Sequence, residues 1–191
     1  MQKYVNTLQP QLSGEFYADE TEIDREKNKN DIFWCSVDWQ TRYINATLYS
    51  PNEQNMIDGI EFMKRIKESK TIPKYIQTDA LGLYPQAFKT VFYSNKGKRE
   101  EQPKHLINNF QKTRTHNVRI ETVFMKIKDR VNDFRGLKAL WSAPILLAGI
   151  VLQHNYIEAH TTTGVVPCEL ANLKMELGQN RWLGLIKMAS N

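Results

Sequence analysis

Runs of alternating or periodic apolar residues divide most of the chain into short strands and helices. Three runs rich in aromatic and β-branched residues lie close together near the N-terminus and predict three hairpin-linked strands. Two shorter strands and four helices follow them along the chain. The predicted strands cover residues 15–23, 32–39, 42–49, 74–79 and 104–110. Three of the predicted helices cover residues 83–93, 117–134 and 140–160.

The remaining helix follows the third strand and has a recognisable start. Ser50, Pro51 and Glu53 suit the N-cap, first and third positions of a helix, which predicts that it begins at Ser50. One apolar stripe at helical spacing then runs from Met56 to Ile66. At the other end of the chain, Gly136 is a suitable residue to end the long helix over 117–134.

This order of elements predicts an α/β domain with a mixed five-stranded sheet flanked by helices. The three antiparallel strands come first, and a crossover helix then leads to a parallel fourth strand. The ribonuclease H-like fold has this order of elements. Residues 1–13 are too polar to belong to the predicted domain, so we expect them to form a leader or linker.

Composition excludes several classes of protein. With 41% hydrophobic and 10% aromatic residues, the chain is too apolar to be mainly disordered. Its longest apolar run, residues 143–152, contains Pro144 and is about half the roughly 20 residues that a membrane-spanning helix needs. The N-terminal residues contain no apolar core typical of a secretory signal. Cys35 and Cys168 lie far apart, which favours two reduced thiols in a cytoplasmic protein with no membrane partner.

Charge is distributed unevenly along the chain. Residues 1–60 carry ten acidic and five basic residues, whereas residues 61–191 carry eleven acidic and twenty-one basic residues. Residues 96–138 alone hold twelve bases against five acids. A basic second half beside an acidic first half indicates a polyanionic partner that contacts the second half.

Three carboxylates have positions that suggest chemistry. Asp19 lies inside the first strand, where a carboxylate is costly unless a positive group meets it. Asp79 ends the fourth strand, and ligands of α/β sheets bind beyond the carboxyl ends of strands. Glu121 lies one residue from the start of the apolar stripe of the long helix. Taken singly, each has an ordinary alternative: an edge-strand residue, a helix N-cap, and half of an exposed Glu–Lys pair.

Together, the three carboxylates would suit two Mg²⁺ ions, because hard cations prefer oxygen ligands. A metal pair about 4 Å apart can clamp the attacking and leaving oxygens of a phosphoryl displacement. Asn117, Lys128 and Arg135 fall within about 40° of Glu121 on one flank of the helix, where cations could hold a DNA backbone. Asp38 is equally acidic but ends a strand beside a turn, so we interpret it as a turn residue.

The sequence around these carboxylates resembles DDE-type insertion-sequence transposases, which have a retroviral-integrase-like catalytic core. The matching stretches are YADET around Asp19, SVDWQTRYI over residues 36–44, IQTDALGLYPQAF around Asp79 and NVRIETVFMKIKDRVNDFRGLK around Glu121. HNYIEAHTTTGVVPCELANL resembles the closing segment of the family. The resemblance covers residues 14–173, which are therefore expected to form the catalytic core, with residues 174–191 as a C-terminal tail.

The resemblance implies a ribonuclease H-like fold, two Mg²⁺ or Mn²⁺ ions, and cleavage of transposon ends followed by joining of the 3′-OH to target DNA. Asp19, Asp79 and Glu121 match the metal-binding catalytic triad, and Lys128 matches a basic residue that contacts DNA. The other candidate DNA-binding residues are Asn117, Lys126, Arg130, Arg135 and Lys138. The implied partner is double-stranded DNA, bound by a homodimer or higher oligomer associated with the nucleoid in a prokaryotic cytoplasm.

Two features depart from the family pattern. Only eighteen residues precede Asp19, too few for the N-terminal zinc-ribbon or helix-turn-helix domain that reads transposon ends. The 41 residues between Asp79 and Glu121 exceed the usual spacing, and the polar loop over 94–103 can absorb the excess. The alternative is therefore a truncated, non-catalytic DNA-binding remnant or a regulator of a full-length transposase. A host nuclease of the same fold fits the segment after Glu121 less well.

Overall fold

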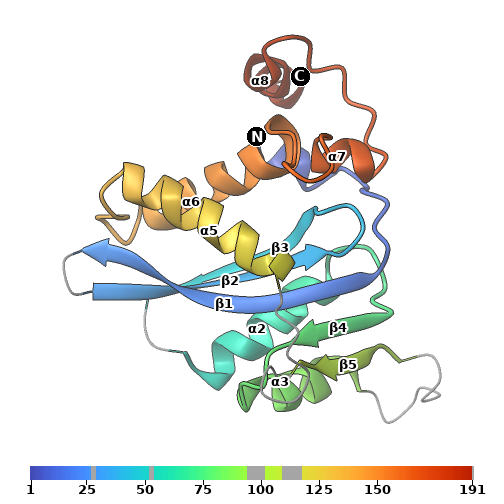
Figure 1. The fold of residues 1–191 in the computed structure, drawn as a ribbon, viewed down its shortest axis with the longest axis vertical. Helices are drawn as coiled ribbons and strands as arrows, with labels where there is room; N and C mark the ends of the chain where they lie inside the picture. The colour runs from blue at the N-terminus through green and yellow to red at the C-terminus, as the bar shows by residue number, and fades with distance from the viewer. Residues whose placement is uncertain (27–28, 52–53, 94–101, 109–117, 191) are drawn as a thin grey trace.

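A five-stranded mixed sheet lies between helices that cover both of its faces (Figure 1). The computed structural model describes residues 1–26, 29–51, 54–93, 102–108 and 118–190. The strand order is β3-β2-β1-β4-β5, with β1, β2 and β3 antiparallel and with β4 and β5 parallel to β1. The strands are β1 (Glu15–Glu26), β2 (Lys29–Asp38), β3 (Ile44–Ser50), β4 (Tyr75–Thr78) and β5 (Lys104–Ile107). The predicted sheet is confirmed in strand number and mixed pairing.

Helices α2 and α3 cover one face of the sheet, and α5 and α6 cover the other (Figure 1). Short helices near both ends of the chain complete the fold. The helices are α1 (Gln2–Val5), α2 (Met56–Lys67), α3 (Leu83–Phe92), α5 (Val118–Asp133), α6 (Ala143–Leu152), the π-helical turn η2 (Gln153–Ile157), α7 (Pro167–Leu170) and α8 (Arg181–Ser190). The predicted helix over 117–134 is confirmed over 118–133, and residue 117 lies outside the described residues.

Alternation along β1 divides the core in two, because successive side chains of a strand point to opposite faces. Phe16 and Ala18 pack into the cluster formed with α2 and α3, where Trp34 and Phe62 are fully buried. Ile23 packs into the second cluster, together with the apolar stripe of α5. Asp19 lies four residues before Ile23 on β1, so its side chain points to the same face of the sheet, the one covered by α5.

The start of α2 differs from the prediction. The helix begins at Met56 with Asn55 as its N-cap, and the Asn55 side chain accepts a hydrogen bond of 2.9 Å from the Asp58 amide. Ser50, the predicted cap, is instead the last residue of β3. Its hydroxyl accepts a hydrogen bond of 3.0 Å from the indole of Trp34. The tertiary contact with a buried tryptophan thus outweighs the local capping pattern.

The predicted single helix over 140–160 is also divided. Pro144 occupies the first turn of α6, and after Leu152 the helix widens into η2. Within this turn the buried Asn155 accepts a hydrogen bond from the Ile44 amide and donates one to the Ile44 carbonyl, both 2.9 Å long. The widened turn therefore ties the end of α6 to the outer edge of β3.

Gly136 ends the long helix as predicted. Its φ is +91°, and its amide bonds back to the Val131 carbonyl at 3.0 Å. A Cβ at this position would lie 2.8 Å from the Arg25 carbonyl oxygen, so only glycine fits. The next two residues continue onto β1, where the Leu137 amide donates to the Asp24 carbonyl at 3.0 Å. The end of α5 is thereby fixed against the far end of β1.

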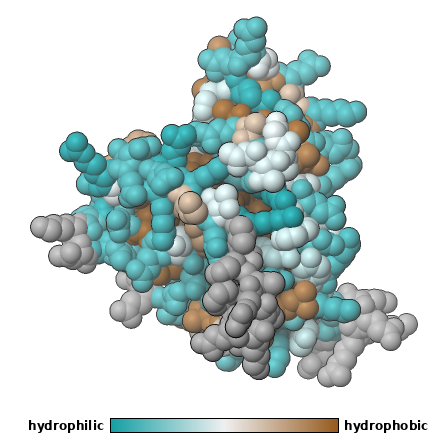
Figure 2. Space-filling model, in the orientation of Figure 1, coloured by the Kyte–Doolittle hydropathy of each residue, from teal (hydrophilic) through white to brown (hydrophobic). Residues whose placement is uncertain are grey.

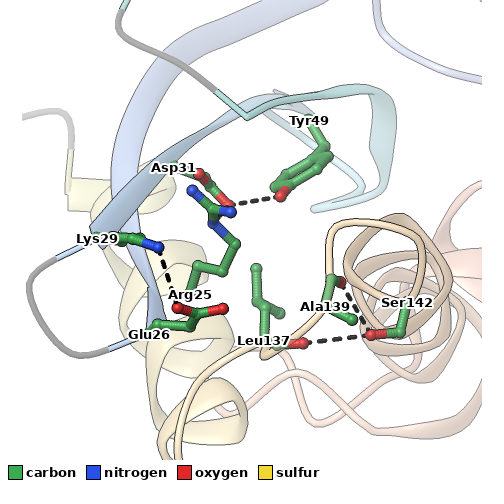
Figure 3. A network of polar contacts seen from close by, with 8 residues as sticks. All are labelled: Arg25, Glu26, Lys29, Asp31, Tyr49, Leu137, Ala139 and Ser142. Atoms are coloured by element: carbon green, nitrogen blue, oxygen red, sulfur yellow. Dashed lines mark hydrogen bonds and ion pairs between the residues drawn. The ribbon is translucent and has the colours of Figure 1, made fainter.

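A network of polar contacts lies at that far end of the β1–β2 hairpin (Figure 3). Asp31 is completely buried, and its carboxylate pairs with the Arg25 guanidinium at 3.0 Å and accepts a hydrogen bond from the Tyr49 hydroxyl. Glu26 and Lys29 form a second pair at 3.3 Å, but both of their side chains are about half exposed. The two ion pairs are thus close in the sequence, but the Arg25–Asp31 pair is buried and the Glu26–Lys29 pair is exposed to solvent.

Residues near the two ends of the chain pack together in a third apolar cluster. Val5 of α1 and the fully buried Leu185 of α8 both belong to it, beside Tyr156 of η2. The polar segments expected as leader and tail thus each contribute a buried side chain. The face of the molecule seen in Figure 2 is hydrophilic over most of its area. Among the described residues, no helix combines the length and apolar character that a bilayer span requires.

Candidate metal centre

Three carboxylates meet at the boundary between β1 and β4. Tyr17 of β1 pairs with Gln77 of the parallel strand β4, so two residues further on Asp19 comes opposite Asp79. Glu20 follows Asp19 directly. Carboxylate oxygens of Asp19, Glu20 and Asp79 all lie within 4.8 Å of one another. The sheet therefore brings together two of the three acids predicted from the sequence and adds one that was not predicted.

Local geometry holds Asp79 at the end of β4. Its Oδ1 accepts a hydrogen bond of 2.9 Å from the Leu81 amide, which is an Asx turn leading toward α3. The Thr78 hydroxyl donates to the Asp79 carbonyl oxygen at 2.9 Å and also contacts the His105 ring at 2.9 Å. Hydrogen bonds from the residue before Asp79 and from the second residue after it thus hold the end of β4 in place.

Asp19 lies in an environment that disfavours its negative charge. Burial, followed by the charges of Glu20 and Asp79, raises its pKa to about 8, although a hydrogen bond from the Glu20 amide acts in the opposite direction. The side-chain charges that shift this pKa are all acidic among the described residues. A group of acids without a neutralising base is what a divalent cation requires, and oxygen donors suit Mg²⁺ or Mn²⁺. The residues present therefore fit the predicted metal.

Glu20 is the acid that the sequence interpretation missed. Its Oε1 accepts a hydrogen bond of 2.7 Å from Gln54, and its Oε2 accepts one from the Tyr84 hydroxyl. Tyr84 belongs to α3 and is fully buried. Burial and the charge of Asp79 raise the pKa of Glu20, and the hydrogen bond from Tyr84 lowers it. The available signal was the pair of adjacent acids, Asp19 and Glu20, in a central strand.

Glu121 lies in the first turn of α5, with an exposed side chain. Its charge is one of the causes that raise the pKa of Asp19, so it lies within electrostatic reach of the carboxylates on the β1–β4 boundary. It is not one of the three acids whose oxygens lie within 4.8 Å of one another. The role of Glu121 as the third ligand remains a prediction.

The structure separates the predicted DNA-binding residues into different places. Lys128 is exposed and lies seven residues after Glu121, on the same flank of α5. Arg130 is paired with Glu158 at 2.8 Å and with Asp133 at 3.7 Å. Lys128 is therefore better placed than Arg130 to contact DNA beside the carboxylates.

The remaining candidates lie elsewhere or outside the described residues. Arg135 and Lys138 follow α5, and the Lys138 amide bonds to the Arg25 carbonyl at 2.9 Å. Arg25 is six residues beyond Asp19 on β1, about 20 Å along the strand. Lys126 is partly buried and lies near His160, whose pKa its charge lowers. Asn117 lies outside the described residues.

The raised pKa of Asp19 predicts how the stability of the metal-free protein depends on pH. The folded protein keeps the Asp19 proton up to a pH of about 8, whereas the unfolded chain loses it near 3.8. Between these values the folded state binds more protons, so stability falls as the pH rises. Asp19→Asn should remove this penalty and raise the free energy of unfolding at pH 8 by up to about 5 kcal/mol.

Urea denaturation in EDTA at pH 4, 6 and 8 measures the difference between wild type and Asp19→Asn. The difference should be small at pH 4 and largest at pH 8. Asp24→Asn, at an exposed acid of the same strand, serves as the control and should change little at any pH. A constant difference across the three pH values would contradict the raised pKa of Asp19.

Comparison with known families identifies the chain. Residues 14–160 match the family profile of the DDE domain of IS240-type transposases. This match includes Asp19, Asp79 and Glu121 and covers most of the chain. No curated protein sequence matches the chain.

Solved structures support the fold. A chain of the simian T-cell lymphotropic virus intasome, in complex with PP2A regulatory subunit B56 gamma, superimposes with a TM-score of 0.61 at 16% identity. That match covers 86% of this chain, which spans only 55% of the intasome chain.

The HTLV-2 integrase catalytic core domain in complex with magnesium matches in a trimeric form, with a TM-score of 0.54 at 15% identity, and in a dimeric form, with 0.56 at 16%. Both matches cover 86% of this chain, and they cover 98% and 97% of the core domain. The predicted ribonuclease H-like fold is thus confirmed. The chain belongs to the family of DDE domains of IS240-type transposases.

Proposed function

We propose that this chain is the catalytic core of a DNA transposase that cleaves transposon ends and joins the freed 3′-OH to target DNA. The observation that carries the proposal is the convergence of Asp19 and Asp79 at the boundary of two parallel strands, within the electrostatic reach of Glu121. These carboxylates lie in a family and a fold whose members include polynucleotidyl transferases.

Asp19, Asp79 and Glu121 are the proposed ligands of two Mg²⁺ or Mn²⁺ ions. When bound, such a pair of ions supplies Lewis-acid stabilisation to the attacking and leaving oxygens of an in-line displacement. Strand pairing fixes Asp19 and the Asx turn fixes Asp79, so their carboxylates need little reordering. Glu121 lies in the first turn of α5 and would be the third carboxylate ligand. Lys128, exposed on the same flank, would hold the DNA backbone near the carboxylates.

We also propose that the chain acts as a dimer or higher oligomer on double-stranded DNA, in the nucleoid of a prokaryotic cell. The HTLV-2 integrase core domains of the same fold are described in dimeric and trimeric forms. The start of α6 supports an assembly of this kind, because Trp141 is 76% exposed and Ile145 is 65% exposed. Neighbouring exposed apolar side chains favour a protein–protein contact.

A cleavage assay tests the proposed activity. The substrate is a labelled duplex that ends in the terminal repeat of the element encoding this chain, incubated with Mg²⁺, Mn²⁺ or EDTA. We expect strand cleavage and joined products only with a divalent metal, because the acids alone provide no group that stabilises the leaving oxygen. Cleavage that persists in EDTA contradicts a metal-dependent site. DNA binding without cleavage under any condition supports the alternative of a non-catalytic DNA-binding protein.

A further inference from the structure

Two arginines from distant parts of the chain converge on Trp39, which follows the end of β2. The Arg42 guanidinium lies 5.5 Å from the centre of the indole ring, and that of Arg119 lies 2.9 Å from it. Both arginines also donate a hydrogen bond to the Trp39 carbonyl oxygen. Tyr17 of β1 stacks on the same indole, with ring centroids 4.6 Å apart and planes 24° apart. The indole thus forms a rigid support that holds two guanidinium groups beside each other.

The two arginines at this support, Arg42 and Arg119, have no carboxylate in ion-pair contact among the described residues. The nearby Asp38 is buried and already accepts four hydrogen bonds, two from Ser13 and two from Thr41. The buried Nε of Arg42 has no hydrogen-bond partner among the described residues. The charge of Asp38 acts on Arg42, but neither arginine is in ion-pair contact with a described carboxylate, and the unbonded Nε of Arg42 is a further donor that an anionic ligand would satisfy.

A third cation lies close by. Burial lowers the pKa of His160, and the next causes are the positive charges of Lys126, Arg42 and Arg119. Positive charges from the segment after β2 and from two positions of α5 therefore lie within electrostatic reach of one imidazole. Arg119 and Lys126 are seven residues apart, so they leave α5 on the same side. The three positive charges therefore lie close enough to act on the same imidazole.

We propose that Arg42 and Arg119 together bind one DNA backbone phosphate that is not the scissile one, with Lys126 beside them. The inference rests on the proposed function and adds a substrate-binding subsite to it. The planar fork of a guanidinium suits the oxygens of a phosphate, and stacking on Trp39 reduces the freedom that each arginine loses on binding. Trp39 is a positioning residue in this arrangement.

The position of the subsite explains why its phosphate differs from the scissile one. Tyr17, beneath Trp39, is two residues before Asp19 on the same face of β1, which is about 6.6 Å along the strand. Arg119 is two residues before Glu121, but a turn of about 200° places their side chains on opposite flanks of α5. The arginines therefore contact the DNA beside the cleavage site, where they fix its path without touching the reacting phosphate.

Binding of a short fluorescein-labelled duplex, followed by fluorescence anisotropy in Mg²⁺ at several salt concentrations, tests the proposal. The variants are Arg42→Gln, Arg119→Gln and the double variant. Each single variant should bind about 5- to 10-fold more weakly, and the slope of log affinity against log salt should fall by about 1. Because the two arginines share one phosphate, the double variant should lose about 1 in slope and not 2. Arg42→Lys and Arg119→Lys keep the charge and should keep most of the slope.

Arg65→Gln is the matched control, since Arg65 is an exposed arginine of α2 on the opposite face of the sheet. It should leave the affinity and the slope unchanged. The subsite is overturned if Arg42→Gln and Arg119→Gln behave like Arg65→Gln while the wild type binds DNA with a clear salt dependence. A slope loss of about 2 in the double variant overturns the shared phosphate. A wild type that does not bind the duplex refutes the proposed function itself.

Discussion

Replacing Asp19 or Asp79 by asparagine is expected to lower the rate of metal-dependent strand cleavage by at least about 100-fold. Substituting a residue that only hydrogen-bonds to a metal ligand typically lowers metal affinity or activity about 10- to 100-fold. Asp19→Asn and Asp79→Asn remove a charged ligand itself, so their effect should be at least as large. Asparagine keeps the shape of the side chain, and neutralising one of several like charges relieves repulsion in the metal-free protein. The loss should therefore occur in a folded domain. Cleavage rates and thermal unfolding of the same preparations measure both effects.

The third ligand can be identified in the same assay by comparing Glu121→Gln with Glu20→Gln. We expect Glu121→Gln to match the loss in the aspartate variants. Glu20→Gln should have a smaller effect, because both Glu20 oxygens already accept hydrogen bonds, from Gln54 and Tyr84. The reverse order of effects would assign the third ligand to Glu20. Wild-type rates in the Asp19 and Asp79 variants would refute catalysis by these carboxylates.

Removing Arg25 should destabilise the protein by about 3–5 kcal/mol, although this residue lies far from the carboxylates on β1 and β4. Asp31 is 0% exposed and Arg25 is 17% exposed, so Arg25→Ala leaves a buried carboxylate without its cation. The Tyr49 hydroxyl remains as a donor, but it carries no positive charge to replace the guanidinium. Urea denaturation at neutral pH measures the loss.

Lys29→Ala provides the control in the same hairpin. Lys29 and Glu26 are 58% and 47% exposed, so their pair contributes less than about 1 kcal/mol (Figure 3). The two alanine variants therefore differ in the burial of the pair that they break. Equal destabilisation by Arg25→Ala and Lys29→Ala would show that Asp31 does not depend on its arginine.

Much of the architecture follows from local patterns. Aromatic and β-branched runs predict the three antiparallel strands, and Gly136 predicts the end of α5, because each signal depends on neighbouring residues alone. The errors occur where a distant residue competes for a side chain. Ser50 bonds to Trp34 and does not cap α2, and Asn155 reaches Ile44 and widens the helix that the apolar pattern predicted as continuous.

The candidate site could be predicted only in part for the same reason. Asp19 and Asp79 are identifiable because a strand interior and a strand end are unusual places for acids. The closeness of Glu20 to Asp19 and Asp79 depends on the residues that pack around β1, such as Tyr84 of α3. The sequence of β1 alone does not determine these contacts. Arg42 and Arg119 meet at Trp39 only through the tertiary fold, since 76 residues separate them in the chain.

The bond between Asn155 and Ile44 has a consequence for how copies of this protein can associate. β3 is an edge strand, and an uncovered edge invites strand addition and aggregation. Asn155 occupies the amide and the carbonyl of Ile44, and the Arg65 guanidinium occupies the Thr47 carbonyl at 2.8 Å. The amide and carbonyl of Ile44 and the carbonyl of Thr47 are therefore already bonded and do not serve a strand from another molecule. These contacts disfavour the pairing of β3 with a strand of another protomer at these two positions.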